Sequence, residues 1–132
     1  MENGVRILIV EDEEEVSSLI REVLKPRAGY IDTAGSMSEA LAKIQRTLPD
    51  LIILDRVLPD GDGSQFCAFL RRHEETKHIP VLFVSALNRS GEPVPASDYV
   101  RKPFDPTELV ARAEALLTAP ESIGLCRLIL ET

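Results

Sequence analysis

Side chains that could carry out chemistry stand at the ends of short apolar runs in this sequence. They are Glu11 and Asp12 after Val5–Val10, and Asp55 after Leu51–Leu54. Carboxylates brought within a few ångströms of one another repel, so they must protonate, move apart or hold a cation. No motif around them raises a carboxylate pKa for acid catalysis, which makes a divalent cation the better explanation. Ligand sets made of carboxylate oxygens favour Mg²⁺ or Mn²⁺.

A hydroxyl and an ammonium end two further runs, because Ser85 follows Val81–Val84 and Lys102 follows Asp98–Arg101. With a metal ion and Asp55 as the nucleophile, they form a set suited to a phosphoryl group, whose oxygens they would neutralise and hydrogen-bond. Simpler explanations stay open for each residue alone. Asp55 can merely open a turn, Ser85 can end a strand and Lys102 can be solvated.

The apolar runs are typical of strands that are buried on both faces of a sheet. The expected strands are Val5–Val10, Tyr30–Ala34, Leu51–Leu54, Val81–Val84 and Asp98–Arg101, of which Tyr30–Ala34 is polar enough for an edge. Amphipathic helices are predicted between them. Leu19 and Leu48 are expected on the buried faces of the first two helices. The expected helix caps are Ser36, Ser64 and Asp105.

Strands and helices alternate five times with short connections, a pattern that predicts a parallel sheet with helices on both faces and right-handed crossovers. The fold class is therefore α/β, and a five-stranded chain of this length suits the flavodoxin-like order 2-1-3-4-5. Strands one and three are neighbours in that order. Glu11, Asp12 and Asp55 should then converge on one crevice at the carboxyl edge of the sheet.

Composition limits the possible partners. With 44% hydrophobic and 28% charged residues, the 132 residues suit one globular domain. A net charge of -7 argues against direct binding of this domain to nucleic acid or to an anionic membrane. Cys67 and Cys126 stand far apart without a ligand-like spacing, so two reduced thiols and a cytoplasmic location are expected. Neither a signal peptide nor a membrane-inserted helix is expected.

The chain resembles the CheY-like receiver domain of two-component response regulators from about Val5 to Leu117. The matching segments are, in order, Ile9–Glu13, Asp50–Asp55, Leu58–Gly63, Val84–Ala86 and Asp98–Phe104. Any one of them is weak, but the set in this order is highly specific. The resemblance implies that Asp55 accepts a phosphoryl group from a sensor histidine kinase or a histidine phosphotransfer protein.

The resemblance also implies a metal site. Asp12 and Asp55 would bind Mg²⁺, or alternatively Mn²⁺, directly. The backbone carbonyl of Val57 would be the third protein ligand, and Glu11 would act mainly through water.

Activation is implied to involve three further residues. Ser85 would be the switch hydroxyl that moves onto the phosphoryl group, and Lys102 would be the ion-pair partner of that group. Tyr99 matches the aromatic residue that follows Ser85 inward, although burial at the sheet edge explains it equally well.

The chain departs from the family in two places. The segment between Ser85 and Lys102 is shorter than usual and contains Pro93 and Pro95, so the fourth helix is expected to be shortened or lost. Receivers use that region for dimerisation and output, so the change puts the usual dimerisation and output mode in doubt, though not the phosphoryl site; a homodimer remains among the expected partners. Val57 and Leu87 are apolar where some relatives carry groups that orient the hydrolytic water, which predicts slow autodephosphorylation.

The expected boundaries are a receiver domain over 1–117 and, over 118–132, a C-terminal tail or the start of a missing neighbour. The tail contains apolar residues that should pack on this domain, on another copy or on that neighbour.

Three functions compete. The leading one is a phosphorylatable signalling switch that is not an enzyme beyond its own phosphoryl transfer and slow dephosphorylation. A haloacid-dehalogenase-like phosphatase would need a second aspartate two residues after Asp55, where Val57 stands. A degenerate receiver that only docks partners is the third.

Overall fold

The computed structural model describes residues 4–86 and 97–118. Its sheet contains β1 (Arg6–Val10), β2 (Tyr30–Ala34), β3 (Leu51–Leu54), β6 (Val81–Ser85) and β7 (Asp98–Arg101). A short hairpin of β4 (Val57–Leu58) and β5 (Gly61–Asp62) follows β3. The α-helices in these two ranges are α1 (Glu14–Leu24), α2 (Met37–Arg46), α3 (Gly63–Arg71) and α4 (Pro106–Thr118), and the 3-10 turn η2 (Lys25–Arg27) follows α1.

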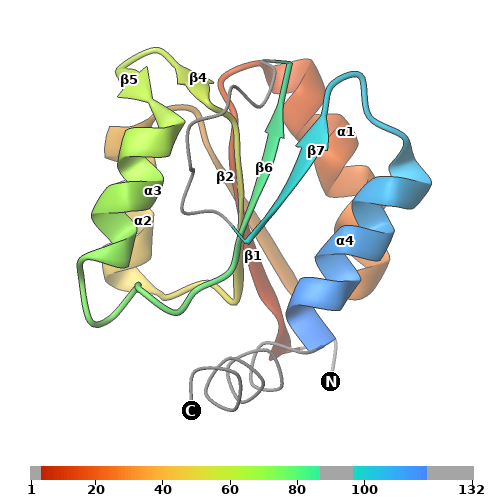
Figure 1. The fold of residues 1–132 in the computed structure, drawn as a ribbon. Coiled ribbons are helices and arrows are strands. Elements are labelled where there is room, and N and C mark those ends of the chain that lie inside the picture. Colours follow the sequence, from red (N-terminus) through yellow and green to blue (C-terminus); the bar gives the residue numbers. More distant parts are fainter. Residues whose placement is uncertain (1–3, 87–96, 119–132) are drawn as a thin grey trace, which may run out of the picture.

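Neighbouring strands of the sheet are all parallel, in the order β2-β1-β3-β6-β7. This is the predicted flavodoxin-like order, because β6 and β7 are the fourth and fifth strands of this sheet along the chain. Figure 1 shows α2 and α3 on one face of the sheet and α1 and α4 on the other. The predicted α/β class and topology are confirmed.

The central strand β3 shows why its sequence is apolar without a break. Leu51 and Ile53 join the core under α1 and α4, whereas Ile52 and Leu54 join the core under α2 and α3. Each of these side chains is at most 1% exposed, and full burial of one contributes roughly 1.5–3 kcal/mol. The strand is therefore fixed from both faces, and its last residue delivers Asp55 to a defined place.

Two expected core residues are exposed instead. Leu19 is 51% exposed because the buried stripe of α1 is narrow and consists of Ser17, Ile20 and Leu24. Leu48 is 46% exposed because α2 ends at Arg46 and the backbone is already extended at the next residue, so Leu48 does not continue the helical face. Helical periodicity alone overestimated the width of the buried face of α1 and the length of the buried face of α2.

The helix caps agree with the sequence at two of three positions. Ser36 Oγ accepts a hydrogen bond from the Glu39 N–H at 3.1 Å, and Asp105 Oδ1 accepts one from the Thr107 N–H at 2.9 Å. The prediction of Ser64 as a cap was wrong. Asp62 caps α3, and its Oδ1 accepts hydrogen bonds from both the N–H and the hydroxyl of Ser64. A charged carboxylate is the stronger acceptor for a helix N-terminus.

The predicted loss or shortening of the family's fourth helix falls on 87–96, which lie outside the described residues, as does the apolar tail 119–132. Among the residues that are described, no helix has the length and apolar character needed to cross a membrane.

Gly63→Ala tests how closely α3 approaches the phosphoacceptor candidate. A β-carbon at Gly63 would collide with the backbone carbonyl of Asp55 and lie 3.0 Å from Arg56 Cα, so α3 or the end of β3 must move. We expect urea unfolding to show a loss of about 1–3 kcal/mol, the usual cost of overpacking. Gly35→Ala is the matched control, since its β-carbon would meet only Glu39 Oε1 at 3.8 Å. Equal effects of the two substitutions would contradict the predicted clash.

Candidate functional site

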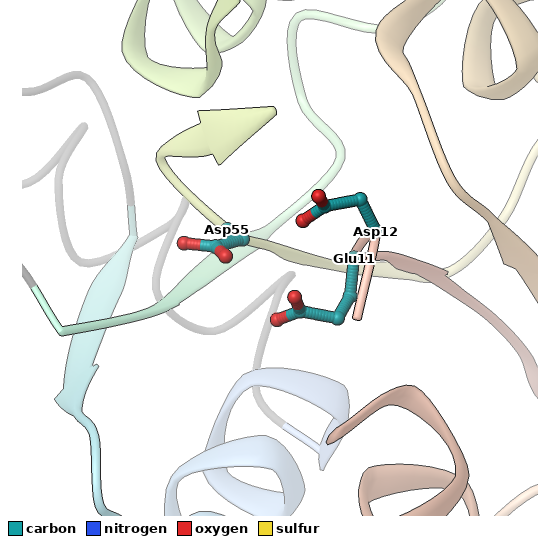
Figure 2. Close-up of side chains that lie close together, drawn as sticks. All are labelled: Glu11, Asp12 and Asp55. Carbon is teal, nitrogen blue, oxygen red and sulfur yellow. The ribbon is translucent and has the colours of Figure 1, made fainter. Parts of the chain in front are cut away.

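The predicted carboxylates converge at the carboxyl edge of the sheet. Ligand atoms of Glu11, Asp12 and Asp55 lie within 4.8 Å of one another, a spacing that could hold a metal ion. Figure 2 shows Glu11 and Asp12 reaching from the end of β1 toward the space beside Asp55. Glu11 is 4% exposed and Asp55 6% exposed, whereas Asp12 is open to solvent.

The backbone ladders extend one residue beyond the strands and fix these positions. The Glu11 N–H donates to the Ala34 carbonyl at 2.9 Å, and the Asp55 N–H donates to the Val10 carbonyl at 3.0 Å. On the other side, the Lys102 N–H donates to the Ser85 carbonyl at 2.9 Å. The strand tips are therefore held in register up to the candidate site residues.

Lys102 forms ion pairs with carboxylates of this site. Its Nζ lies 2.7 Å from Glu11 Oε1 and 3.1 Å from Asp55 Oδ2, with Glu13 Oε1 farther away at 3.8 Å. The ammonium side chain is only 14% exposed, so water screens these contacts weakly. The prediction that Lys102 reaches the same crevice as Asp55 agrees with this geometry.

Burial and like charge make ionisation of Glu11 costly. Desolvation raises the pKa of Glu11 and the charge of Asp55 raises it further, while the hydrogen bonds from Lys102 and from the Glu13 N–H oppose the rise. For Lys102, burial opposes the charged form, but the hydrogen bond to Glu11 and the charges of Glu11 and Asp55 outweigh it and raise the pKa. Lys102 is therefore stabilised in its charged form, and the negative charge of the carboxylates favours binding of a further cation.

The switch candidates occupy the neighbouring strands. Ser85 ends β6 and is fully buried, one strand away from β3. Tyr99 on β7 is partly buried, and its ring lies 6.4 Å from that of Phe83, tilted by 41°. The structure thus places Tyr99 on the face covered by α2 and α3, packed against the core of that face.

Val57, like Asp12, is an exposed member of the predicted site. Its side chain is on the surface, with 56% of the residue exposed, while its N–H donates to Asp55 Oδ1 at 3.3 Å. The hairpin of β4 and β5 holds its backbone through pairing of Val57 with Asp62. The backbone of Val57 is thus tied to Asp55.

Sequence reasoning missed two contributors to the site. Glu13 supplies a backbone N–H to Glu11 Oε2 at 3.1 Å and a distant carboxylate to Lys102. Gly63 permits α3 to start directly against the backbone of Asp55, and its N–H donates to the Arg56 carbonyl at 2.6 Å. The run of acids after β1 and the repeated Asp-Gly after β3 were the available signals.

The comparison with protein families agrees with the geometry. The family model described as response regulator receiver domain matches residues 7–114. The chain belongs to this family of receiver domains.

Similar proteins are numerous among transcriptional regulators. The phosphate regulon transcriptional regulatory protein PhoB of Rhizobium meliloti is 40% identical over 117 residues, which are 85% of this chain and 52% of that protein. The alkaline phosphatase synthesis transcriptional regulatory protein PhoP of Bacillus subtilis is 38% identical over 122 residues, covering 88% of this chain and 50% of that protein. The receiver chain thus spans about half the length of these curated relatives.

Solved structures show the same fold. A putative response regulator from Chloroflexus aurantiacus superposes with a TM-score of 0.78 at 38% identity, covering 86% of this chain and 98% of that one. The chemotaxis response regulator CheY4 of Vibrio cholerae gives a TM-score of 0.78 at 28% identity, covering 86% of this receiver and 99% of that chain.

Glu11→Gln tests the crowding of carboxylates. Because the pKa of Glu11 is raised by folding, the folded receiver binds this proton more tightly than the unfolded chain does. The resulting stability is present below the unfolded pKa and is lost as the pH rises through the raised folded pKa. In metal-free buffer, urea unfolding should show wild type losing stability relative to Glu11→Gln across that window, by about 1.4 kcal/mol per unit of raised pKa.

Glu22→Gln, on an exposed position of α1, is the control for the loss of one carboxylate. If the difference between wild type and Glu11→Gln does not change with pH, the crowding does not affect Glu11 as described.

Proposed function

We propose that this receiver accepts a phosphoryl group on Asp55 from the phosphohistidine of a sensor histidine kinase or a histidine phosphotransfer protein. The observation that carries the proposal is the ammonium of Lys102 set between Asp55 and Glu11 in a nearly buried crevice. A carboxylate that only opens a turn needs no such partner. Membership of the receiver family supports the same role.

The donor set fits a hard divalent cation. Glu11, Asp12 and Asp55 offer oxygens that lie close enough for one ion, and Mg²⁺ prefers carboxylate and carbonyl oxygens, with Mn²⁺ as the alternative. Asp12 and Asp55 would bind it directly, the Val57 carbonyl would complete the protein ligands, and Glu11 would act through water. When bound, the cation supplies positive charge next to the phosphoryl oxygens.

Each residue of the site would have its own role in the phosphoryl transfer. A carboxylate oxygen of Asp55 forms the new O–P bond while the N–P bond of the phosphohistidine breaks, and the imidazole keeps the electron pair and is reprotonated by solvent. Lys102 neutralises the transferred group. The Ser85 hydroxyl then donates a hydrogen bond to that group, and Tyr99 moves with Ser85 and reports the change on the surface.

The chain's relatives support a proposal for the output of the switch. PhoB and PhoP are named as transcriptional regulatory proteins, and this chain corresponds to about half of each. In our proposal the receiver spans 1–117, controls a partner, a second copy or a neighbouring module that begins in 118–132, and contacts no nucleic acid itself. We also propose a cytoplasmic location, because the two cysteines of the sequence lack the spacing of a disulfide framework or a metal site.

Asp55→Asn should abolish phosphorylation. Incubation with Mg²⁺ and a small acyl-phosphate donor should add the mass of one phosphoryl group to the wild-type protein, and the adduct should be absent in Asp55→Asn. Asp50→Asn is the matched control, because Asp50 lies at the opposite end of β3 and accepts a hydrogen bond from the Arg6 N–H. Absence of an adduct in all three proteins would favour the docking module.

The phosphorylated state should be long-lived, because the exposed Val57 side chain cannot orient the water that attacks the aspartyl phosphate. Val57→Asn combined with Leu87→Glu should shorten the lifetime of the adduct several-fold, measured by intact mass after removal of the donor. Leu87 lies outside the described residues. The control pair Val57→Ala with Leu87→Ala stays apolar and should keep the lifetime. An unchanged lifetime in the polar pair would contradict the explanation.

A further inference from the structure

The tip of the β4–β5 hairpin is attached to a helix that is distant in sequence. Asp60 accepts a hydrogen bond from the Met37 N–H through Oδ1 at 2.9 Å and from the Ser38 N–H through Oδ2 at 3.0 Å. Both N–H groups belong to the first turn of α2, where backbone donors lack partners within the helix. The carboxylate thus spans two donors at the positive end of the helix.

The next residue, Gly61, lies close to the side chain of Met37 on the same helix. Gly61 has a φ of 149°, which L side chains rarely adopt, and a β-carbon there would collide with Cε of Met37. Gly61 therefore leaves room for the Met37 side chain between hairpin and helix, and the Asp60 hydrogen bonds attach the hairpin to α2.

The other end of the hairpin is attached to α3. Asp62 pairs with Val57 across the hairpin and caps α3 through the N–H and hydroxyl of Ser64, at 2.9 and 2.8 Å. Arg56 Nε lies 3.4 Å from Asp62 Oδ1 and adds charge to this end. The hairpin is thus attached to the N-terminus of α2 at its tip and to the N-terminus of α3 at its end.

Val57 is the first residue of this hairpin. The residue is 56% exposed, so burial does not hold its side chain, and its backbone lies between the two attachments of the hairpin. The same backbone carries the carbonyl assigned above to the cation and the N–H that donates to Asp55 Oδ1.

We propose that Asp60 is a positioning residue, which fixes the Val57 backbone beside Asp55 by anchoring the hairpin to the N-terminus of α2. This inference deepens the proposed function and rests on it for the role of the Val57 carbonyl. It differs from a simple capping role, in which Asp60 would stabilise α2 and leave the cation site unchanged. The two roles can be separated because α2 has a second cap, Ser36, whose hydroxyl accepts a hydrogen bond from the Glu39 N–H of the same helix.

The test compares Asp60→Ala, Asp60→Asn and Ser36→Ala in the full chain. Thermal unfolding measures the loss of each cap, and the dissociation constant for Mg²⁺ is obtained by NMR titration of backbone amides. Hydrogen exchange at Leu58 and Gly61 reports on the hairpin. Both alanine variants remove a cap from α2 and should lower the melting temperature.

Only release of the hairpin should affect the cation site. We expect the Mg²⁺ dissociation constant to rise about tenfold in Asp60→Ala, the usual effect of removing a group that orients a metal ligand. Asp60→Asn keeps one acceptor and should show a smaller rise. Ser36→Ala should bind Mg²⁺ as wild type does, and the hairpin amides should exchange faster only in the Asp60 variants.

An unchanged Mg²⁺ dissociation constant in Asp60→Ala, with a melting temperature lowered as in Ser36→Ala, would overturn the proposal and leave Asp60 as a cap. If Asp60→Ala does not fold, the same comparison between Asp60→Asn and Ser36→Ala decides. A wild-type protein that binds Mg²⁺ but gains no phosphoryl group would refute the proposed function, whereas the metal titrations would still decide the role of Asp60. Failure of the wild-type protein to bind Mg²⁺ would refute both.

Discussion

The ion pairs of Lys102 are the interaction on which the rest of the site depends. Glu11 and Asp55 are nearly buried at adjacent strand tips, where two carboxylates without a cation would repel strongly. The ammonium contacts both of them, and its own pKa is raised because these contacts outweigh its burial. A buried charge without a partner is costly to any fold, so the position of Lys102 and the positions of the acids constrain each other.

A parallel sheet supplies this arrangement with little help from loops. Its inner strands β1, β3 and β6 are apolar on both faces, so they are fixed by α1 and α4 on one side and by α2 and α3 on the other. Their carboxyl ends then meet at one edge, with backbone hydrogen bonds from Glu11, Asp55 and Lys102 extending the ladders. The polar residues that follow each strand become neighbours although they are far apart in sequence.

The sequence predicted what depends on strand periodicity and missed what depends on contacts between loops and helices. Convergence of Glu11, Asp12, Asp55 and Lys102 follows from the sheet order, which alternation of strands and helices indicates. The exposure of Leu48 could not be predicted, because the end of α2 is set by local backbone conformation that Pro49 only limits. Asp60 could not be recognised either, since its partners Met37 and Ser38 are brought near it only by the tertiary fold.

Lys102 lies closer to Glu11, at 2.7 Å, than to Asp55, at 3.1 Å, and this difference suits the charge balance of the proposed transfer. An aspartyl phosphate would add negative charge to a crevice that already holds three carboxylates, and one ammonium offsets only part of it. A divalent cation beside Asp12, the exposed member of the set, would supply the remainder from the solvent side. Lys102 can then exchange its 3.1 Å contact with Asp55 for a phosphoryl oxygen while the 2.7 Å contact with Glu11 keeps the ammonium in place. In the proposed transfer, Glu11 would hold the ammonium in place without being modified itself.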